Sequence, residues 1–126
     1  MSEDMSLYYI PDVKYSKLTS EDSNRIANDF FNHRGEYKFI AYLGSRTILS
    51  DYNNSSKNSN TDPVYYFISM RDIKRCAEDY DEFLKELLEA EEDYKIILEY
   101  LEDKKLYQKI VKRYPKDSVF VLKDGF

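Results

Sequence analysis

The sequence contains no glycine and no proline between Val64 and Tyr114, and this stretch most constrains the fold. Such a run permits extended helices and disfavours sandwiches, which need a turn about every ten residues. Because helices average about three turns, we expect a break within residues 89–93 or 102–106. From Arg71 onward the apolar residues recur at helical spacing on one predicted core stripe: Ile73, Cys76, Tyr80, Phe83, Leu84, Leu87, Leu88, Tyr94, Leu98 and Leu101.

The N-terminal part predicts a short strand followed by a helix. Residues 7–10 are rich in strand formers and are followed by Pro11, which indicates an edge strand that ends there. Thr19 is a predicted N-cap, because acidic residues follow it in the first turn and an apolar helical repeat comes next. Gly35 is typical of the residue that ends such a helix.

Three further segments predict strands. Residues 37–43 and 46–52 flank Gly44-Ser45, and this pattern is typical of a type II′ hairpin, with Lys38 opposite Asp51. The other two predicted strands are residues 64–69 and 119–122.

These elements predict one α+β domain over residues 1–126, in the order (β)-α-β-β-β-α-α-β. We expect a mainly antiparallel sheet packed by helices, with a long acidic amphipathic helical region near the C-terminus. Residues 53–63 are polar up to Pro63 and predict a mobile loop.

The formal charge of −5 is distributed unevenly along the chain. Residues 1–76 are neutral, residues 77–105 carry −8 and residues 106–126 carry +3. Acids in the middle segment recur about one helical turn apart, ~5–6 Å, which resembles the spacing of phosphates along a nucleic-acid strand. They form either a solvated outer face or a nucleic-acid-mimicking binding surface, for which the candidates are Glu78, Glu82, Glu86, Glu89, Glu92 and Asp93.

Tyrosine is abundant, with 13 residues and no tryptophan. A small core uses few tyrosines, because each buried hydroxyl needs a hydrogen-bond partner, and surface tyrosine is enriched in protein interfaces. We therefore take Tyr8, Tyr9 and Tyr52 as candidate partner-binding residues. The alternative is that their rings lie at the edge of the core with the hydroxyls in water.

The sequence lacks the usual signatures of catalysis and of cofactor binding. Its three glycines stand apart, so it has no glycine-rich phosphate loop. One cysteine and one histidine cannot form a zinc site, and we interpret Cys76 as a core residue rather than a nucleophile paired with His33. We expect no cofactor and no bound metal.

One resemblance suggests a different class of protein. Pro11-Asp12 followed by Glu36-Tyr37-Lys38 resembles the PD-(D/E)xK pattern of metal-dependent nucleases, whose core order is α-β-β-β-α-β. In that family the aspartate and the triplet follow the first helix on consecutive strands, whereas Asp12 precedes the predicted helix here. The resemblance implies a nuclease as an alternative function.

The second alternative function is a small regulator that binds nucleic acid through the basic segment 104–116. Pairing of this segment with the acidic helix, within or between chains, explains the same charges.

We expect a non-enzymatic interaction protein in the host cytoplasm, with neither a membrane segment nor direct nucleic-acid binding. Its composition suits a phage or mobile-element inhibitor that binds a host nucleic-acid enzyme or defence protein. The sequence also permits a homodimer.

Overall fold

The computed structural model describes residues 5–33, 38–43, 47–49 and 64–124. Its strands form one antiparallel sheet in the order β2-β1-β4-β3. This arrangement confirms the predicted α+β fold with an antiparallel sheet packed by helices. The elements are β1 (Met5–Lys14), the 3-10 helix η1 (Tyr15–Lys17), α1 (Ser20–Asn32), β2 (Lys38–Tyr42), β3 (Val64–Ser69), α2 (Met70–Glu89), α3 (Tyr94–Arg113) and β4 (Ser118–Asp124).

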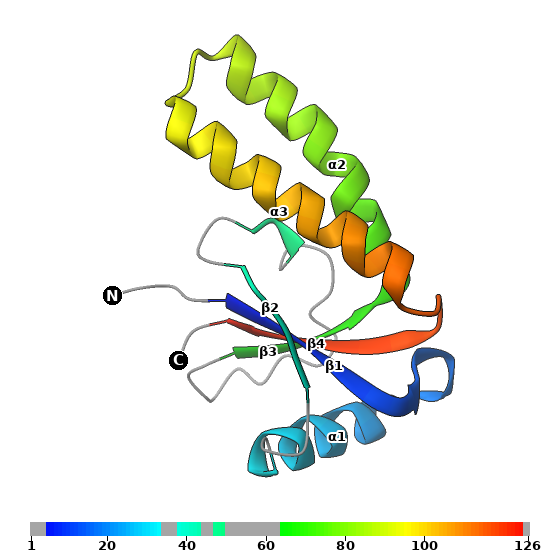
Figure 1. Cartoon of the computed structure of the whole chain (residues 1–126). Helices are drawn as coiled ribbons and strands as arrows, with labels where there is room; N and C mark the ends of the chain where they lie inside the picture. The colour runs from blue at the N-terminus through cyan, green and yellow to red at the C-terminus, as the bar shows by residue number, and fades with distance from the viewer. Residues whose placement is uncertain (1–4, 34–37, 44–46, 50–63, 125–126) are drawn as a thin grey trace.

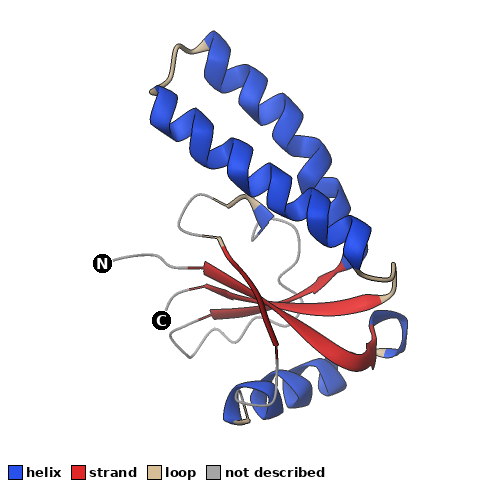
Figure 2. Cartoon of the chain, viewed as in Figure 1, coloured by secondary structure: helices blue, strands red, loops and turns tan. Residues whose placement is uncertain are grey.

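The sheet lies between two helical layers, with α1 on one face and the α2–α3 hairpin on the other (Figures 1 and 2). Side chains of β4 alternate between the two faces. Phe120 and Leu122 pack in the core beneath the hairpin, whereas Val119 and Val121 pack in the core beneath α1. All four are fully buried, which explains why this short apolar segment forms a central strand.

The prediction of an edge strand ending at Pro11 is wrong, because β1 is a central strand that continues to Lys14. Ile10 pairs with Val119 and Lys14 pairs with Ser118, so the three residues between them bulge out of the register with β4. Proline is tolerated there because the bulge requires no N–H in the ladder. Asp12 adopts a φ of 64° within this bulge.

The predicted hairpin around Gly44-Ser45 is wrong in the part that the structure describes. Ala41 pairs with Leu7 of β1, and Thr47–Leu49 form no strand. Thr47 and Leu49 are buried instead, and Leu49 packs in the core beneath the helical hairpin. Residues 47–49 are therefore buried instead of pairing with β2 as a strand. Residues 50–63, which include Asp51 and the predicted loop, lie outside the described residues.

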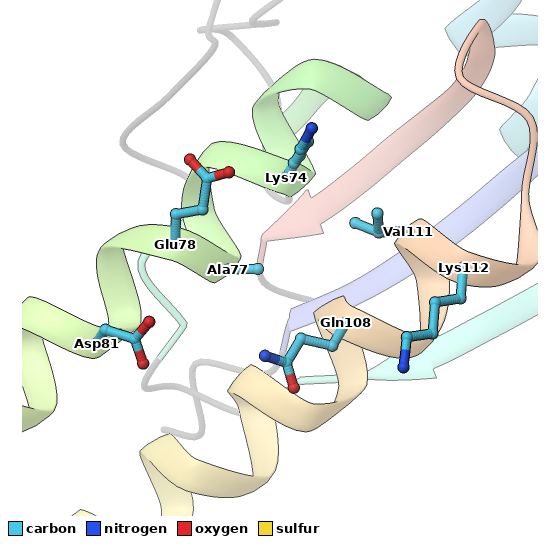
Figure 3. Close-up of a pocket in the computed structure, with 7 residues that line it drawn as sticks. All are labelled: Lys74, Ala77, Glu78, Asp81, Gln108, Val111 and Lys112. Carbon is cyan, nitrogen blue, oxygen red and sulfur yellow. The ribbon is translucent and has the colours of Figure 1, made fainter.

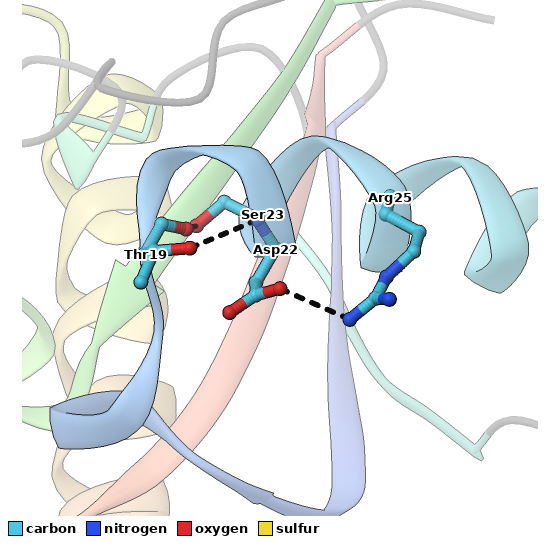
Figure 4. Close-up of polar contacts among 4 residues, drawn as sticks. All are labelled: Thr19, Asp22, Ser23 and Arg25. Carbon is cyan, nitrogen blue, oxygen red and sulfur yellow. Dashed lines mark hydrogen bonds and ion pairs between the residues drawn. The ribbon is translucent and has the colours of Figure 1, made fainter.

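The start of α1 is fixed by local hydrogen bonds (Figure 4). Thr19 Oγ1 accepts from the Asp22 N–H at 3.2 Å, and the Ser23 hydroxyl donates to the Thr19 carbonyl at 2.9 Å. Arg25 forms an ion pair with Asp22 at 3.0 Å. These contacts confirm the predicted N-cap. The helix ends at Asn32, and Gly35 lies outside the described residues.

The long helical region breaks at residues 90–93, the first of the two predicted positions. The Glu91 N–H donates to the Leu88 carbonyl at 3.2 Å, and the Glu92 N–H donates to the Leu87 carbonyl at 3.0 Å. This pair of bonds is a Schellman motif, with Glu91 at a φ of 54° in the position that usually holds glycine. Asp93 then caps α3 by accepting from the Lys95 N–H at 2.9 Å.

Candidate interaction surface

The antiparallel α2–α3 hairpin separates the charges of this region into two halves. We define the distal half as residues 78–103, which include the turn, and the proximal half as residues 70–77 and 104–116. The distal half contains twelve acids and two lysines, a net charge of −10. The proximal half contains nine lysines and arginines and one aspartate, a net charge of +8. The hairpin is therefore polarised along its length.

All six acidic site candidates lie on the distal half and are exposed. The chain enters α2 from β3 and leaves α3 towards β4, so the turn between the helices lies far from the sheet (Figure 1). The hairpin thus brings together the acids that the sequence analysis singled out: Glu78, Glu82, Glu86, Glu89, Glu92 and Asp93.

Exposed apolar side chains accompany these acids. The predicted stripe is buried along much of α2, but Phe83 is 36% exposed, Leu88 62%, Tyr94 71% and Leu98 42%. The prediction that these four residues belong to the core is therefore wrong. The turn at residues 90–93 changes the phase of the repeat, so α3 turns a different face inward. The buried residues of α3 are Ile97, Asp103, Tyr107 and Ile110.

The tyrosine candidates lie apart from the distal half. Tyr8 packs on Phe30 beneath α1, with ring centroids 5.3 Å apart. Tyr9 packs on Tyr114 on the opposite face of the sheet, with centroids 4.6 Å apart. Both rings are half-buried at the edge of the core, and Tyr52 lies outside the described residues. The structure therefore does not bring Tyr8 and Tyr9 together with the acids.

A buried polar network joins the two helices, and the sequence analysis missed it. The Tyr80 hydroxyl donates to Asp103 Oδ2 at 3.4 Å and accepts from the Ile48 N–H at 3.3 Å. Tyr107 stacks on Tyr80 with centroids 5.7 Å apart, and its hydroxyl bonds Thr47. Only the helical spacing of Asp103 with Tyr107 and Ile110 would have indicated that an acid faces the core.

The pKa of Asp103 is raised from 3.8 to about 6. Burial is the main cause, the hydrogen bond from Tyr80 lowers the pKa, and the negative charges of Glu99 and Glu102 contribute to raising it. Burial likewise raises the pKa values of the Tyr80 and Tyr107 hydroxyls. Asp103 also lines a cavity of about 350 Å³ on the outside of the network. The network therefore links α2 and α3 to each other and to residues 47–49.

The basic segment 104–116 lies next to the N-terminal part of α2, not next to the most acidic part. Lys104 of this segment forms an ion pair with Asp81 of α2. The structure therefore contains one contact of the expected kind, between the basic segment and the acidic helix of the same chain. Further along, the two helices flank a groove of about 310 Å³ (Figure 3). The groove is lined by Lys74, Ala77, Glu78, Asp81, Gln108, Val111 and Lys112.

The residues of the nuclease-like pattern are described only in part. Asp12 is exposed in the β1 bulge, whereas Glu36 and Tyr37 lie outside the described residues. Between α1 and α2 the described chain contains two strands, not three consecutive ones. Among the residues that the structure describes, no group of three or more histidines, cysteines or carboxylates is placed to hold a metal ion.

The other candidate pair, Cys76 and His33, belongs to different parts of the molecule. Cys76 is fully buried in the core beneath the hairpin, which confirms its interpretation as a core residue. His33 is exposed at the end of α1, where its ring bonds the Asp29 carbonyl at 3.3 Å.

Neither protein-family models, nor curated proteins, nor solved structures gave a match to this chain. Within the described residues, the helices are all too short or too polar to cross a membrane.

Proposed function

We propose that this protein is a non-enzymatic interaction protein that uses the distal half of the helical hairpin to bind the basic surface of a nucleic-acid-binding protein. The observation that carries this proposal is the grouping of the acids. Twelve acids and two lysines occupy one projecting structure, and eleven of the twelve acids are exposed. A surface of this charge attracts a lysine- and arginine-lined groove and releases its counterions, as DNA does.

The apolar residues at the turn support a protein partner. Leu88 and Tyr94 flank the four-residue turn and are the most exposed large apolar side chains among the described residues. Apolar anchors surrounded by polar residues are typical of protein interfaces, where they supply affinity while charge guides association.

The local energetics also support a role for the acids. Glu78, Glu82 and Glu86 follow one another at intervals of four residues, and such like-charge pairs destabilise a helix slightly. Glu91 adopts a positive φ at a position that favours glycine. A surface that only needed to be soluble would not require acids at these positions.

Occupation of a basic groove would exclude the nucleic acid, so we propose that the protein inhibits its partner. A phage or mobile-element inhibitor of a host nucleic-acid enzyme or defence protein is the concrete form of this proposal.

A capture experiment tests the proposal. The immobilised protein is incubated with a nuclease-treated bacterial lysate, and retained proteins are quantified by mass spectrometry. We expect retention of nucleic-acid-binding proteins that duplex DNA displaces, and loss of these proteins with Glu82→Lys/Glu86→Lys.

The matched control is Glu21→Lys/Asp29→Lys, which changes two exposed acids of α1 by the same total charge. This control should retain the partner. Equal retention by the wild type and the Glu82→Lys/Glu86→Lys variant would contradict the proposal.

A further inference from the structure

The two halves of the hairpin are complementary to each other as well as to outside partners. A helix of 20 residues is about 30 Å long, and α2 and α3 both have this length. Their acidic and basic residues therefore form two adjacent regions along one straight structure. Two such hairpins placed side by side in opposite directions bring each acidic half against a basic half.

The groove between the helices gives this arrangement a specific contact. Gln108 and Lys112 line the groove from α3, and Leu101 and Tyr94 precede Gln108 by seven and fourteen residues, which is about two and four turns of the helix. Residues at this spacing lie on the same side of a helix. The exposed Tyr94 therefore lies on the groove side of α3, nearer to the turn.

The same reasoning applies to α2. Ala77 and Asp81 line the groove, and Leu84 and Leu88 continue their spacing towards the turn. One side of the hairpin thus presents exposed apolar residues at its distal end and, at its proximal end, an open groove with Ala77 and Val111 in its lining. Lys74 and Lys112 line the same groove together with Glu78 and Asp81, and Asp81 already pairs with Lys104 of its own chain. Residues 89–93 flank the exposed apolar residues with four acids.

We propose that a second copy of this chain occupies the groove, in a two-fold symmetric antiparallel dimer. Leu88 and Tyr94 of each copy pack into the groove of the other, and the acids around the turn pair with Lys74 and Lys112. The symmetry makes both contacts identical and closes the assembly at two chains. A second copy is favoured over a nucleic acid, because the net charge of −5 opposes binding of a polyanion and the exposed apolar residues need an apolar partner.

The dimer uses the same distal surface as the proposed function and goes beyond it, because self-association would compete with partner binding. Sedimentation velocity of the purified protein alone tests it, at about 50 mM and about 500 mM salt. We expect a dimer at low salt that weakens at least about tenfold at high salt. A wild-type protein that remains monomeric at about 100 µM in low salt would overturn the proposal.

Two charge-reversal variants test the arrangement. Glu89→Lys/Glu91→Lys/Glu92→Lys changes the net charge of residues 89–93 from −4 to +2, and Lys74→Glu/Lys112→Glu makes the groove acidic. We expect each variant alone to be monomeric and folded by circular dichroism, and an equimolar mixture to form a dimer. A mixture that stays monomeric overturns the antiparallel pairing, even if the wild type dimerises.

Two further measurements complete the test. Tyr94→Asp should also give a folded monomer, because it places a charge in the apolar contact. Binding of a duplex oligonucleotide by a monomeric wild type, lost with Lys74→Glu/Lys112→Glu, would assign the groove to nucleic acid and overturn the second copy. Both measurements use the purified protein without a partner. A negative result here therefore concerns the dimer alone and is distinguishable from a negative result in the capture experiment.

Discussion

The Tyr80 hydroxyl donates a hydrogen bond to Asp103 Oδ2 at 3.4 Å, linking α2 to α3 in the interior of the molecule. Asp103 is 9% exposed and is the only buried charged residue in the described part of the chain. This bond lies at the end of the distal half that adjoins the proximal half, so its chemistry affects the stability of the structure that presents the acids.

Asp103→Asn should stabilise the protein at neutral pH. The folded-state pKa of Asp103, about 6, lies above its usual value of 3.8, so the folded protein binds the proton more tightly than the unfolded chain. The contribution of Asp103 is therefore fully present below about pH 4 and is lost as the pH rises to about 6. A shift of about two pKa units corresponds to about 2–3 kcal/mol. Urea unfolding from pH 4 to pH 7.5 should show this gain for the variant at pH 7, and parallel profiles for the two proteins would refute it.

Tyr80→Phe should destabilise the protein by about 1–3 kcal/mol. The substitution removes the donor to Asp103 and the acceptor for the Ile48 N–H, so two groups lose a hydrogen bond. Tyr94→Phe is the matched control, because its ring is 71% exposed, and it should change the free energy of unfolding by less than about 0.5 kcal/mol. Equal unfolding midpoints in urea for the two variants would disprove the role of the network.

Glu91→Gly should stabilise the protein by about 0.4–1 kcal/mol. Glu91 has a φ of 54°, and glycine adopts this conformation without the steric cost of a Cβ. Thermal unfolding measures the change, with Glu92→Gly as the control at the next residue, for which no positive φ is recorded. A lower melting temperature for Glu91→Gly would show that the backbone conformation is not the limiting factor.

Neutralising the acids of α2 should not weaken the fold. Glu82→Gln/Glu86→Gln removes like-charge pairs at four-residue spacing and negative charge near the C-terminus of the helix, so we expect a gain of about 0.3–0.8 kcal/mol. Urea unfolding at low salt measures it. A clear loss of stability would mean that these acids make structural contacts rather than form a surface for a partner.

The features that sequence patterns predicted correctly are mostly local. Thr19 caps α1 through a residue three positions away, and the break after Glu89 was expected because helices average about three turns. Strands 64–69 and 119–122 are continuous runs of strand formers, and both were found.

The features that were missed depend on residues distant in sequence. Pro11 fits a central strand only because β1 bulges there, out of register with β4. Thr47 is buried away from the predicted hairpin, where its hydroxyl bonds Tyr107, sixty residues later. The burial of Asp103 depends on Tyr80 from another helix. For the candidate site, the sequence predicted the exposed acids but not the exposed Tyr94, because the phase of α3 is set by the turn before it.

The most direct test of the binding role of the distal half is a competition for nucleic acid. Each DNA- or RNA-binding protein retained in the capture experiment is first mixed with a fluorescent oligonucleotide. The protein with the acidic hairpin is then added, and the fluorescence anisotropy of the oligonucleotide is followed. Our account predicts that the wild type and Glu21→Lys/Asp29→Lys displace the oligonucleotide, whereas Glu82→Lys/Glu86→Lys does so at least about tenfold less well. Displacement by the Glu82→Lys/Glu86→Lys variant at wild-type concentrations, or no displacement by the wild type, would contradict it.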